Sequence, residues 1–458
     1  MEQRPVDTAT EIAARVRAGE QAPDAAVRAA LTRIRARDRG IGAFRRVRDD
    51  AALAEARALV GRDDLAELPL AGVPVAVKDV LAVTGESVRE GSAATADAPA
   101  TEDDVLVTRM RAAGAVVMGL TNVPELCAFG STDSVFGTTR NPWNPAHTAG
   151  GSSGGSAAAL AAGMVPIAHG TDGMGSIRGP AAVCGLVGLK PGRGVVPTAL
   201  GSDNWFGLAS SGPMATTVAD VALLGSVLAD APDWRDPQPP AAPLRIGVAA
   251  GTPSPILRLH PAHARALERV GDLLARAGHR VGETRLPYPL DPTGQIARWT
   301  AGVAADIDAA GLDRRRLDKR TRRHAAVGRV LDRLGRIDPR QIDRLAAATD
   351  AVFDRVDVVL TPVLAQPAPR ARRWSERGWT ANMVSSVRYA PYPPLWNLLG
   401  RPAMSVPAGR LPGSGLPIGV QLAGPAGSEA LLLAVARQIE QAAPWPRHVD
   451  DVDEPGAR

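Results

Sequence analysis

The chain has 458 residues, a net charge of +5, 45% hydrophobic and 22% charged residues, a composition typical of a soluble protein with a large core. It contains neither the roughly 18 uninterrupted apolar residues of a membrane span nor the apolar region of a signal peptide, so we expect a cytoplasmic protein without a membrane partner. Its two cysteines, Cys127 and Cys184, are too few for a disulfide scaffold and lack spaced partners for a metal site.

Hydrophobic periodicity gives the expected elements in chain order. It predicts helices over most of 8–60, a buried strand at 68–77, a helix at 104–113 and a strand at 115–118. Farther along, it predicts a helix at 156–162, a strand at 244–248, a helix at 260–277 and a strand at 356–360. This alternation indicates an α/β sheet with helices on both faces. The polar residues 446–458 are predicted to be disordered.

One segment carries most of the positive charge. Residues 312–344 contain eleven Arg and one Lys against five Asp, a local charge of +7, so the rest of the chain is slightly acidic. A basic helix pair can bind nucleic acid. The interleaved Asp residues instead favour a solvated helical face, and we therefore expect no nucleic-acid partner.

Lysine is rare in this chain. Only Lys78, Lys190 and Lys319 occur, and every other basic residue except histidine is Arg. Lys78 comes at the end of the strand predicted at 68–77, where burial would lower its pKa. A buried lysine can lose its proton and act as a base, whereas arginine cannot. Lys78 is therefore a candidate general base.

Two glycine-rich runs flank the helix predicted at 156–162, GGSSGGS at 150–156 and GTDGMGSIR at 170–178. The first is not typical of a linker because it opens directly onto a helix, and it lacks the Gly-Lys-Ser/Thr of a phosphate-binding loop. The second can supply a serine nucleophile, Ser176, and backbone amides for an oxyanion. Among the seven histidines none has an evident Asp partner, and His169 lies on a predicted strand. A Ser–Lys hydrolase is one hypothesis that these residues leave open.

The block GGSSGGSAAALAAGMVPIAHGTDGMGSIRGPAAVCGLVGLKP (150–191) resembles the signature of the amidase signature family. LAGVPVAVKD (70–79) resembles the strand with that family's catalytic lysine, and 109–126, 136–145, 397–409 and 415–424 are similar to its further motifs, in the same order. The resemblance implies one domain over 1–445 built on a large twisted mixed sheet. It would comprise N-terminal helices (1–65), a signature core (68–230) and a C-terminal part of the sheet (244–442) with a helical insertion at 312–344.

The resemblance also implies a mechanism without a cofactor. Ser176 would be the nucleophile, Ser152 a proton relay preceded by a cis peptide bond, and Lys78 the base in the hydrolysis of a small-molecule amide through an acyl-serine. The implied oxyanion-hole amides are those of Gly173, Met174, Gly175 and Ser176, and the implied supporting residues are Ser153, Asp172 and Arg178. Residues expected either to line the substrate pocket or to pack in the core are Cys127, Phe129, Trp205, Phe206, Tyr389, Tyr392 and Trp396.

Met174 departs from the family pattern, which has glycine at this position. A methionine with positive φ would be strained and would reshape the oxyanion hole. A catalytically silent binding protein is therefore one alternative. A second is acyl transfer, either in a tailoring enzyme or as in the tRNA-dependent amidotransferase subunit, although Gly179 replaces the Gln usual in that subunit. No pattern fixes the oligomeric state, and a homodimer stays open.

Overall fold

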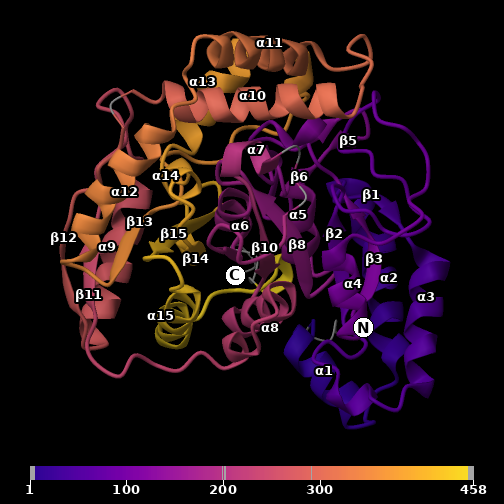
Figure 1. Cartoon of the computed structure of the whole chain (residues 1–458). Coiled ribbons are helices and arrows are strands. Elements are labelled where there is room, and N and C mark those ends of the chain that lie inside the picture. Colours follow the sequence, from indigo (N-terminus) through magenta and orange to yellow (C-terminus); the bar gives the residue numbers. More distant parts are fainter. Residues whose placement is uncertain (1–5, 199, 201–202, 290, 452–458) are drawn as a thin grey trace.

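The computed structural model describes residues 6–198, 200, 203–289 and 291–451 (Figure 1). Within these residues the backbone is organised around an eleven-stranded sheet, accompanied by two small two-stranded sheets. The strands are β1 (Phe44–Val47), β2 (Pro74–Lys78), β3 (Val116–Thr121), β4 (Asp133–Ser134), β5 (Gly137–Thr138), β6 (Arg140–Asn141), β7 (Asn144–Thr148), β8 (Ile167–Asp172), β9 (Val187–Lys190), β10 (Ser210–Ala215), β11 (Arg245–Val248), β12 (Arg280–Glu283), β13 (Val358–Pro362), β14 (Ala403–Arg410) and β15 (Pro417–Ala423).

Helices cover this sheet on both faces, as the sequence predicts. They are α1 (Ala9–Arg17), α2 (Pro23–Ile41), α3 (Asp49–Ala58), α4 (Val105–Ala112), α5 (Gly154–Ala161), α6 (Arg178–Cys184), α7 (Asp203–Gly207), α8 (Val218–Ala229), α9 (Pro261–Arg276), α10 (Thr293–Ala309), α11 (Lys319–Arg333), α12 (Pro339–Phe353), α13 (Trp379–Tyr389), α14 (Pro394–Leu398) and α15 (Glu429–Ala442). Helices α10, α11 and α13 lie together at one end of the molecule, at the top of Figure 1.

The large sheet has the strand order β1-β3-β2-β8-β10-β9-β14-β15-β13-β11-β12. Strand β2 runs parallel to both β3 and β8, whereas β8 and β10 are antiparallel, so the sheet is mixed. Its central strands are buried on both faces: every residue of β2, β3, β8, β9 and β10 is buried. A strand buried on both faces can read as a continuous apolar run, and such runs mark β2 and β3 in the sequence.

The structure differs from the expected elements at both ends of the chain. The predicted strand at 68–77 forms only over Pro74–Lys78, because the chain turns at Gly72, whose φ is +68°. Strand β1 lies within the region expected to be helical. Predicted disorder is not seen for 446–451, where His448 is buried and its N–H donates to Asp451 Oδ2 at 2.9 Å. Residues 452–458 of that tail lie outside the described residues.

Searching the described part of the chain for a membrane-spanning segment finds no helix with the necessary length and hydropathy.

Candidate active site

The candidate site lies where two parallel strands end side by side. Lys78 is the last residue of β2, and Asp172 is the last residue of its parallel neighbour β8. The carboxyl ends of parallel strands meet at one edge of a sheet, where ligands commonly bind in α/β proteins. The sheet topology therefore brings the lysine next to the glycine-rich loop that leaves β8.

Lys78 is fully buried and hydrogen-bonded to two hydroxyl groups. Its Nζ lies 2.7 Å from Ser152 Oγ and 2.6 Å from Thr171 Oγ1. Burial lowers the pKa of Lys78 below the ordinary value of a lysine. A neutral amine that accepts a proton from a serine hydroxyl is compatible with this environment. The role of Thr171 was not foreseen, although the residue stands within the GTDGMGSIR run.

The first glycine-rich run positions Ser152. Gly150 has φ +83°, and the following Gly151–Ser152 peptide bond is cis. A side chain at Gly151 would meet the Phe129 carbonyl oxygen at 2.6 Å, so the backbone passes close to its neighbour. The Ser153 N–H donates to the Ser176 carbonyl oxygen at 3.3 Å. The loops of Ser152 and Ser176 are thus joined by a backbone hydrogen bond.

Asp172 holds the second run in shape. Its carboxylate accepts hydrogen bonds from the Gly175 N–H at 2.7 Å, from the Ile177 N–H at 3.1 Å, and from Arg178 Nε and Nη2, both at 2.9 Å. Asn397 Nδ2 adds a further donor at 2.9 Å. Although burial opposes ionisation, Arg178 and these other donors hold the pKa of Asp172 far below its usual range. The carboxylate is therefore ionised and braces the turn between β8 and α6.

The backbone of this turn changes two expectations. Positive φ occurs at Gly175 (+110°) and not at Met174, so the methionine is not strained. The Gly175 N–H is occupied by Asp172, which corrects its assignment as an available oxyanion-hole donor. Among the described residues, the N–H groups of Gly173, Met174 and Ser176 have no hydrogen-bond acceptor. These three amides are free to receive a substrate oxygen.

Trp205 packs directly on the same loop. The chain enters this position through a left-handed turn, with φ between +48° and +55° at Asp203–Phe206. A Cβ at Gly173 would lie 2.8 Å from the Trp205 ring, and a Cβ at Gly302 of α10 would lie 2.6 Å from it. Trp205 Nε1 donates to Asp306 Oδ2 at 2.7 Å. Absence of side chains at the two glycines lets the indole fill the space between α10 and the loop.

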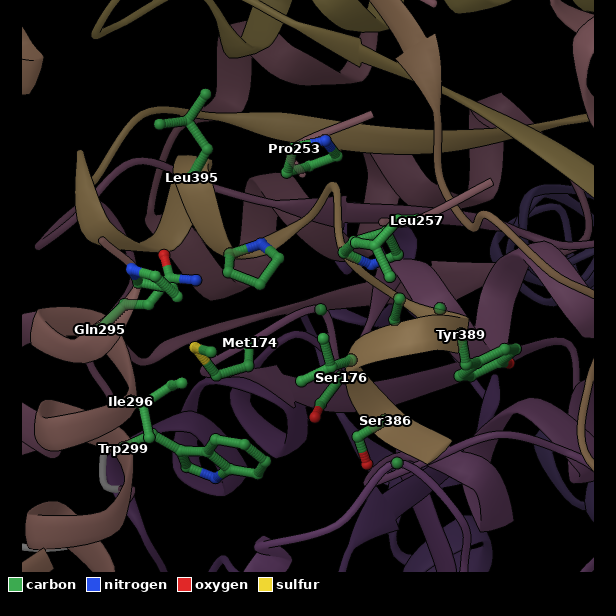
Figure 2. Close-up of a pocket in the computed structure, with 18 of the residues that line it drawn as sticks. Met174, Ser176, Pro253, Leu257, Gln295, Ile296, Trp299, Ser386, Tyr389 and Leu395 are labelled. Carbon is green, nitrogen blue, oxygen red and sulfur yellow. The ribbon is translucent and has the colours of Figure 1, made fainter. Parts of the chain in front are cut away.

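A cavity of about 210 Å³ opens over Ser176. In Figure 2, Met174, Ile296 and Trp299 lie on one side of Ser176, and Leu257 and Tyr389 lie on the other. Among the residues that the structure describes, no histidine lines the cavity, and burial lowers the pKa of His169 to about 3. Lys78, by contrast, is hydrogen-bonded to Ser152 in one of the two serine-bearing loops.

The model of a family described as Amidase matches residues 25–433. The chain belongs to the amidase signature family. Within that family, it is 41% identical over 426 residues to a Mycobacterium tuberculosis protein provisionally named amidase AmiB2, with 91% of each chain covered.

Other relatives of this amidase have named substrates or solved structures. It is 33% identical to the 6-aminohexanoate-cyclic-dimer hydrolase of a Pseudomonas species, over 83% of this chain and 85% of the relative. The solved structure of a 6-aminohexanoate cyclic dimer hydrolase with substrate superposes with a TM-score of 0.84 at 30% identity, covering 96% and 97% of the two chains. That of a bacterial aryl acylamidase superposes with a TM-score of 0.82 at 26% identity, covering 97% and 98%. Together these relatives support an amide-hydrolysing enzyme.

Four of the seven aromatic or cysteine residues expected at the pocket line the amidase cavity, namely Cys127, Phe129, Trp205 and Tyr389. Tyr392 and Trp396 do not. Both are buried in the core, with the Tyr392 hydroxyl donating to the Ala250 carbonyl and Trp396 packing near Phe353. Phe206 is partly buried and also lies outside the lining. Cys127 is buried, which raises its pKa to about 11, so its thiol is neutral near pH 7.

Sequence reasoning missed the part of the amidase cavity that α10 contributes. Gln295, Ile296 and Trp299 all line it. It also missed Asn397, which bridges Asp172 and Arg178 by donating to the first and accepting from Arg178 Nη2 at 2.6 Å. Asn397 begins the motif at 397–409, so its position was visible but its partners were not.

The inner face of the basic segment has a structural function in this amidase. Arg320 of α11 is fully buried and pairs with Asp133 at 3.0 Å. Its guanidinium lies 4.3 Å from the ring centroid of Phe129, a cavity residue. One turn later, His324 packs edge-on against Trp299, with their ring centroids 4.7 Å apart. The inner face of α11 therefore supports the wall of the cavity.

Proposed function

We propose that the enzyme hydrolyses the amide of a small organic substrate through a covalent acyl-serine on Ser176. The observation that carries the proposal is the buried Lys78, hydrogen-bonded to Ser152 beside the Ser176 loop. A serine hydroxyl is a weak nucleophile unless a base removes its proton. Within the described part of the chain, no carboxylate lies within hydrogen-bonding distance of Lys78, and its lowered pKa favours the neutral amine that such a base must be.

In the first half-reaction, the Ser176 hydroxyl gives its proton to Ser152 as Ser152 gives its own to Lys78. Ser176 Oγ forms a bond to the amide carbon, and the carbonyl oxygen becomes an oxyanion. The free N–H groups of Gly173, Met174 and Ser176 supply hydrogen bonds to that oxygen. Collapse of the intermediate breaks the C–N bond, and the proton returns from Lys78 through Ser152 to the leaving nitrogen.

The second half-reaction consumes water. Water gives a proton to Ser152 while Ser152 again protonates Lys78, and the water oxygen attacks the ester carbon. Breaking the ester bond returns the proton to Ser176 Oγ and releases the carboxylic acid. The products are therefore an acid and ammonia or an amine, and the enzyme is regenerated without a cofactor.

Kinetics of three variants test the proposal. Ser176→Ala, Ser152→Ala and Lys78→Ala should each lower the kcat of a primary amide by on the order of 10⁴-fold or more, because the three side chains act as one unit. Ammonia release measures turnover, and circular dichroism shows whether each variant folds. Turnover of folded Ser176→Ala at the wild-type rate would exclude the mechanism.

Met174 does not support a catalytically silent protein. Its φ is not positive, and its N–H remains available, so the substitution changes a side chain of the cavity rather than the backbone of the loop. The methionine side chain therefore influences which substrate shapes the cavity accepts.

A further inference from the structure

We propose that the substrate is an uncharged amide with an extended apolar chain. When the amide is bound at Ser176, this chain extends out of the cavity and lies across an apolar rim. The rim consists of the loop 253–257 and the exposed valines of α13. This proposal rests on the proposed hydrolysis at Ser176 and names the class of amide that the site accepts.

The described residues that line the cavity include no side chain that is charged near neutral pH. None of them is Asp, Glu, Lys, Arg or His. Its polar side chains are neutral, as at Ser254, Gln295 and Ser386, and most of the remaining surface is aromatic, aliphatic or proline. Burying a charged group without a partner is strongly unfavourable. A substrate that fills this cavity is therefore uncharged around its amide.

The two sides of Ser176 differ in exposure. On the α10 side, Trp205 and Trp299 are only 2% and 7% exposed, and Trp205 is anchored to Asp306. The two indoles close the inner part of this side, whereas Pro292 at its outer end is exposed. On the opposite side, Val387 both lines the cavity and is 43% exposed. A chain longer than the cavity can therefore extend past Val387 on the α13 side.

The apolar surface continues beyond the cavity on that side. Val384 is 50% exposed and stands three residues before Val387, on the same helical face. Ile256 is 86% exposed and lies between Pro255 and Leu257, which both line the cavity. Soluble proteins keep few large apolar side chains in solvent at one place unless that place binds something. Continuity with the cavity lining identifies the occupant as the substrate's own chain.

A backbone connection holds the two parts of the rim. The Ala365 N–H donates to the Tyr389 carbonyl at the end of α13 (2.9 Å), and the Ala365 carbonyl accepts from the His260 N–H (2.8 Å) at the start of α9. Ala365 thus links the end of α13 to His260, three residues beyond the loop 253–257.

A chain-length series tests the proposal. The probes are primary alkanamides from butanamide to decanamide, assayed by ammonia release below the concentration at which they aggregate. A half-buried methylene should raise kcat/KM about twofold, so six should raise it on the order of 50-fold. Ile256→Asn and Val384→Asn should each lower the decanamide-to-butanamide ratio of kcat/KM by about threefold.

Val105→Asn is the matched control, because Val105 is 49% exposed on α4 and does not line the cavity. It should leave the ratio unchanged. A ratio near one for the wild type, or equal ratios in Ile256→Asn and the wild type, would overturn the substrate class. Turnover of butanamide that is lost in Ser176→Ala would still support the proposed hydrolysis, so the two proposals can fail separately.

Discussion

Lys78 Nζ and Ser152 Oγ lie 2.7 Å apart although 74 positions separate the two residues in the chain. The lysine comes from the end of a buried strand, and the serine comes from the loop before α5. No solvent reaches the lysine, so its charge is determined by burial and by nearby groups. The proposed proton transfer depends on this one contact.

The pH dependence of turnover tests the role of Lys78. Burial lowers the pKa of Lys78 below the ordinary lysine value of about 10.4. As the pH is raised, Lys78 should therefore lose its proton and become a neutral base at a lower pH than an ordinary lysine. We therefore expect kcat/KM to rise with pH through that pKa and to fall as acid protonates the amine. Lys78→Arg should lose about 10²- to 10⁴-fold in kcat/KM at every pH, since arginine stays protonated.

Deprotonation of Lys190 could also cause kcat/KM to rise with pH. Lys190 is also buried, and burial lowers its pKa to about 7. Its Nζ donates to the Pro191 carbonyl at 2.8 Å and does not line the cavity. The ascending limb should persist in Lys190→Gln. Its disappearance in that variant would assign the pH dependence to Lys190 instead.

Gly175 lies in the loop of Ser176, and Gly194, outside that loop, is a matched control position. Both have positive φ, +110° and +78°, so alanine at either position is strained by about 1–2 kcal/mol. A Cβ at Gly175 would also lie 2.7 Å from Pro393 Cβ, whereas one at Gly194 meets nothing within 4 Å.

Gly175→Ala should therefore displace the loop and lower kcat/KM on the order of 10²-fold, while Gly194→Ala lowers only the free energy of unfolding. Steady-state kinetics and urea unfolding separate the two effects. Equal losses of activity in both variants would argue against a specific role of the loop geometry.

Met174→Ala tests the substrate-shaping role of the methionine. The backbone N–H is retained and φ is not positive, so kcat should stay within about twofold of the wild type. Loss of apolar contact in the cavity should lower kcat/KM for octanamide about tenfold through KM. If Met174→Gly instead raises kcat strongly, then the methionine does impair the oxyanion loop.

Arg320 and Arg322 distinguish the two faces of the basic segment. Arg320→Leu leaves the buried Asp133 without its ionic partner and should lower the free energy of unfolding by about 3–5 kcal/mol. Arg322 is exposed on the same helix, so Arg322→Leu should change it by less than about 0.5 kcal/mol. Urea unfolding of both variants gives the comparison, and similar values would contradict a bracing role of the inner face.

Much of the fold follows from local pattern. The central strands are fully buried, and apolar runs mark β2 and β3 in the sequence. Strand β1 was missed because it has four residues, two of them Arg, and lies between two helices. Its partner β3 is more than seventy residues away, and no local signal reports such a pairing.

Some residues of the candidate site can likewise be predicted from local sequence and others cannot. The scarcity of lysine and its position after a strand indicate Lys78, and a dense glycine run indicates Ser176. Ser152 depends on the family resemblance, because its contact with Lys78 requires the loop before α5 to lie against the end of β2, which no local pattern reports. The sequence could not show which aromatic residues at 389–396 line the cavity and which pack in the core. The reason is that α13 ends at Tyr389 and the chain turns before α14, which directs Trp396 into the core.

The most direct test of the account is the site of covalent modification by a fluorophosphonate, located by mass spectrometry of peptides. If Ser176 is the nucleophile, there should be one adduct, on Ser176, which is absent in Ser176→Ala and forms much more slowly in Lys78→Ala. Undiminished labelling of Ser176→Ala, or an adduct on another residue of the wild type, would contradict it.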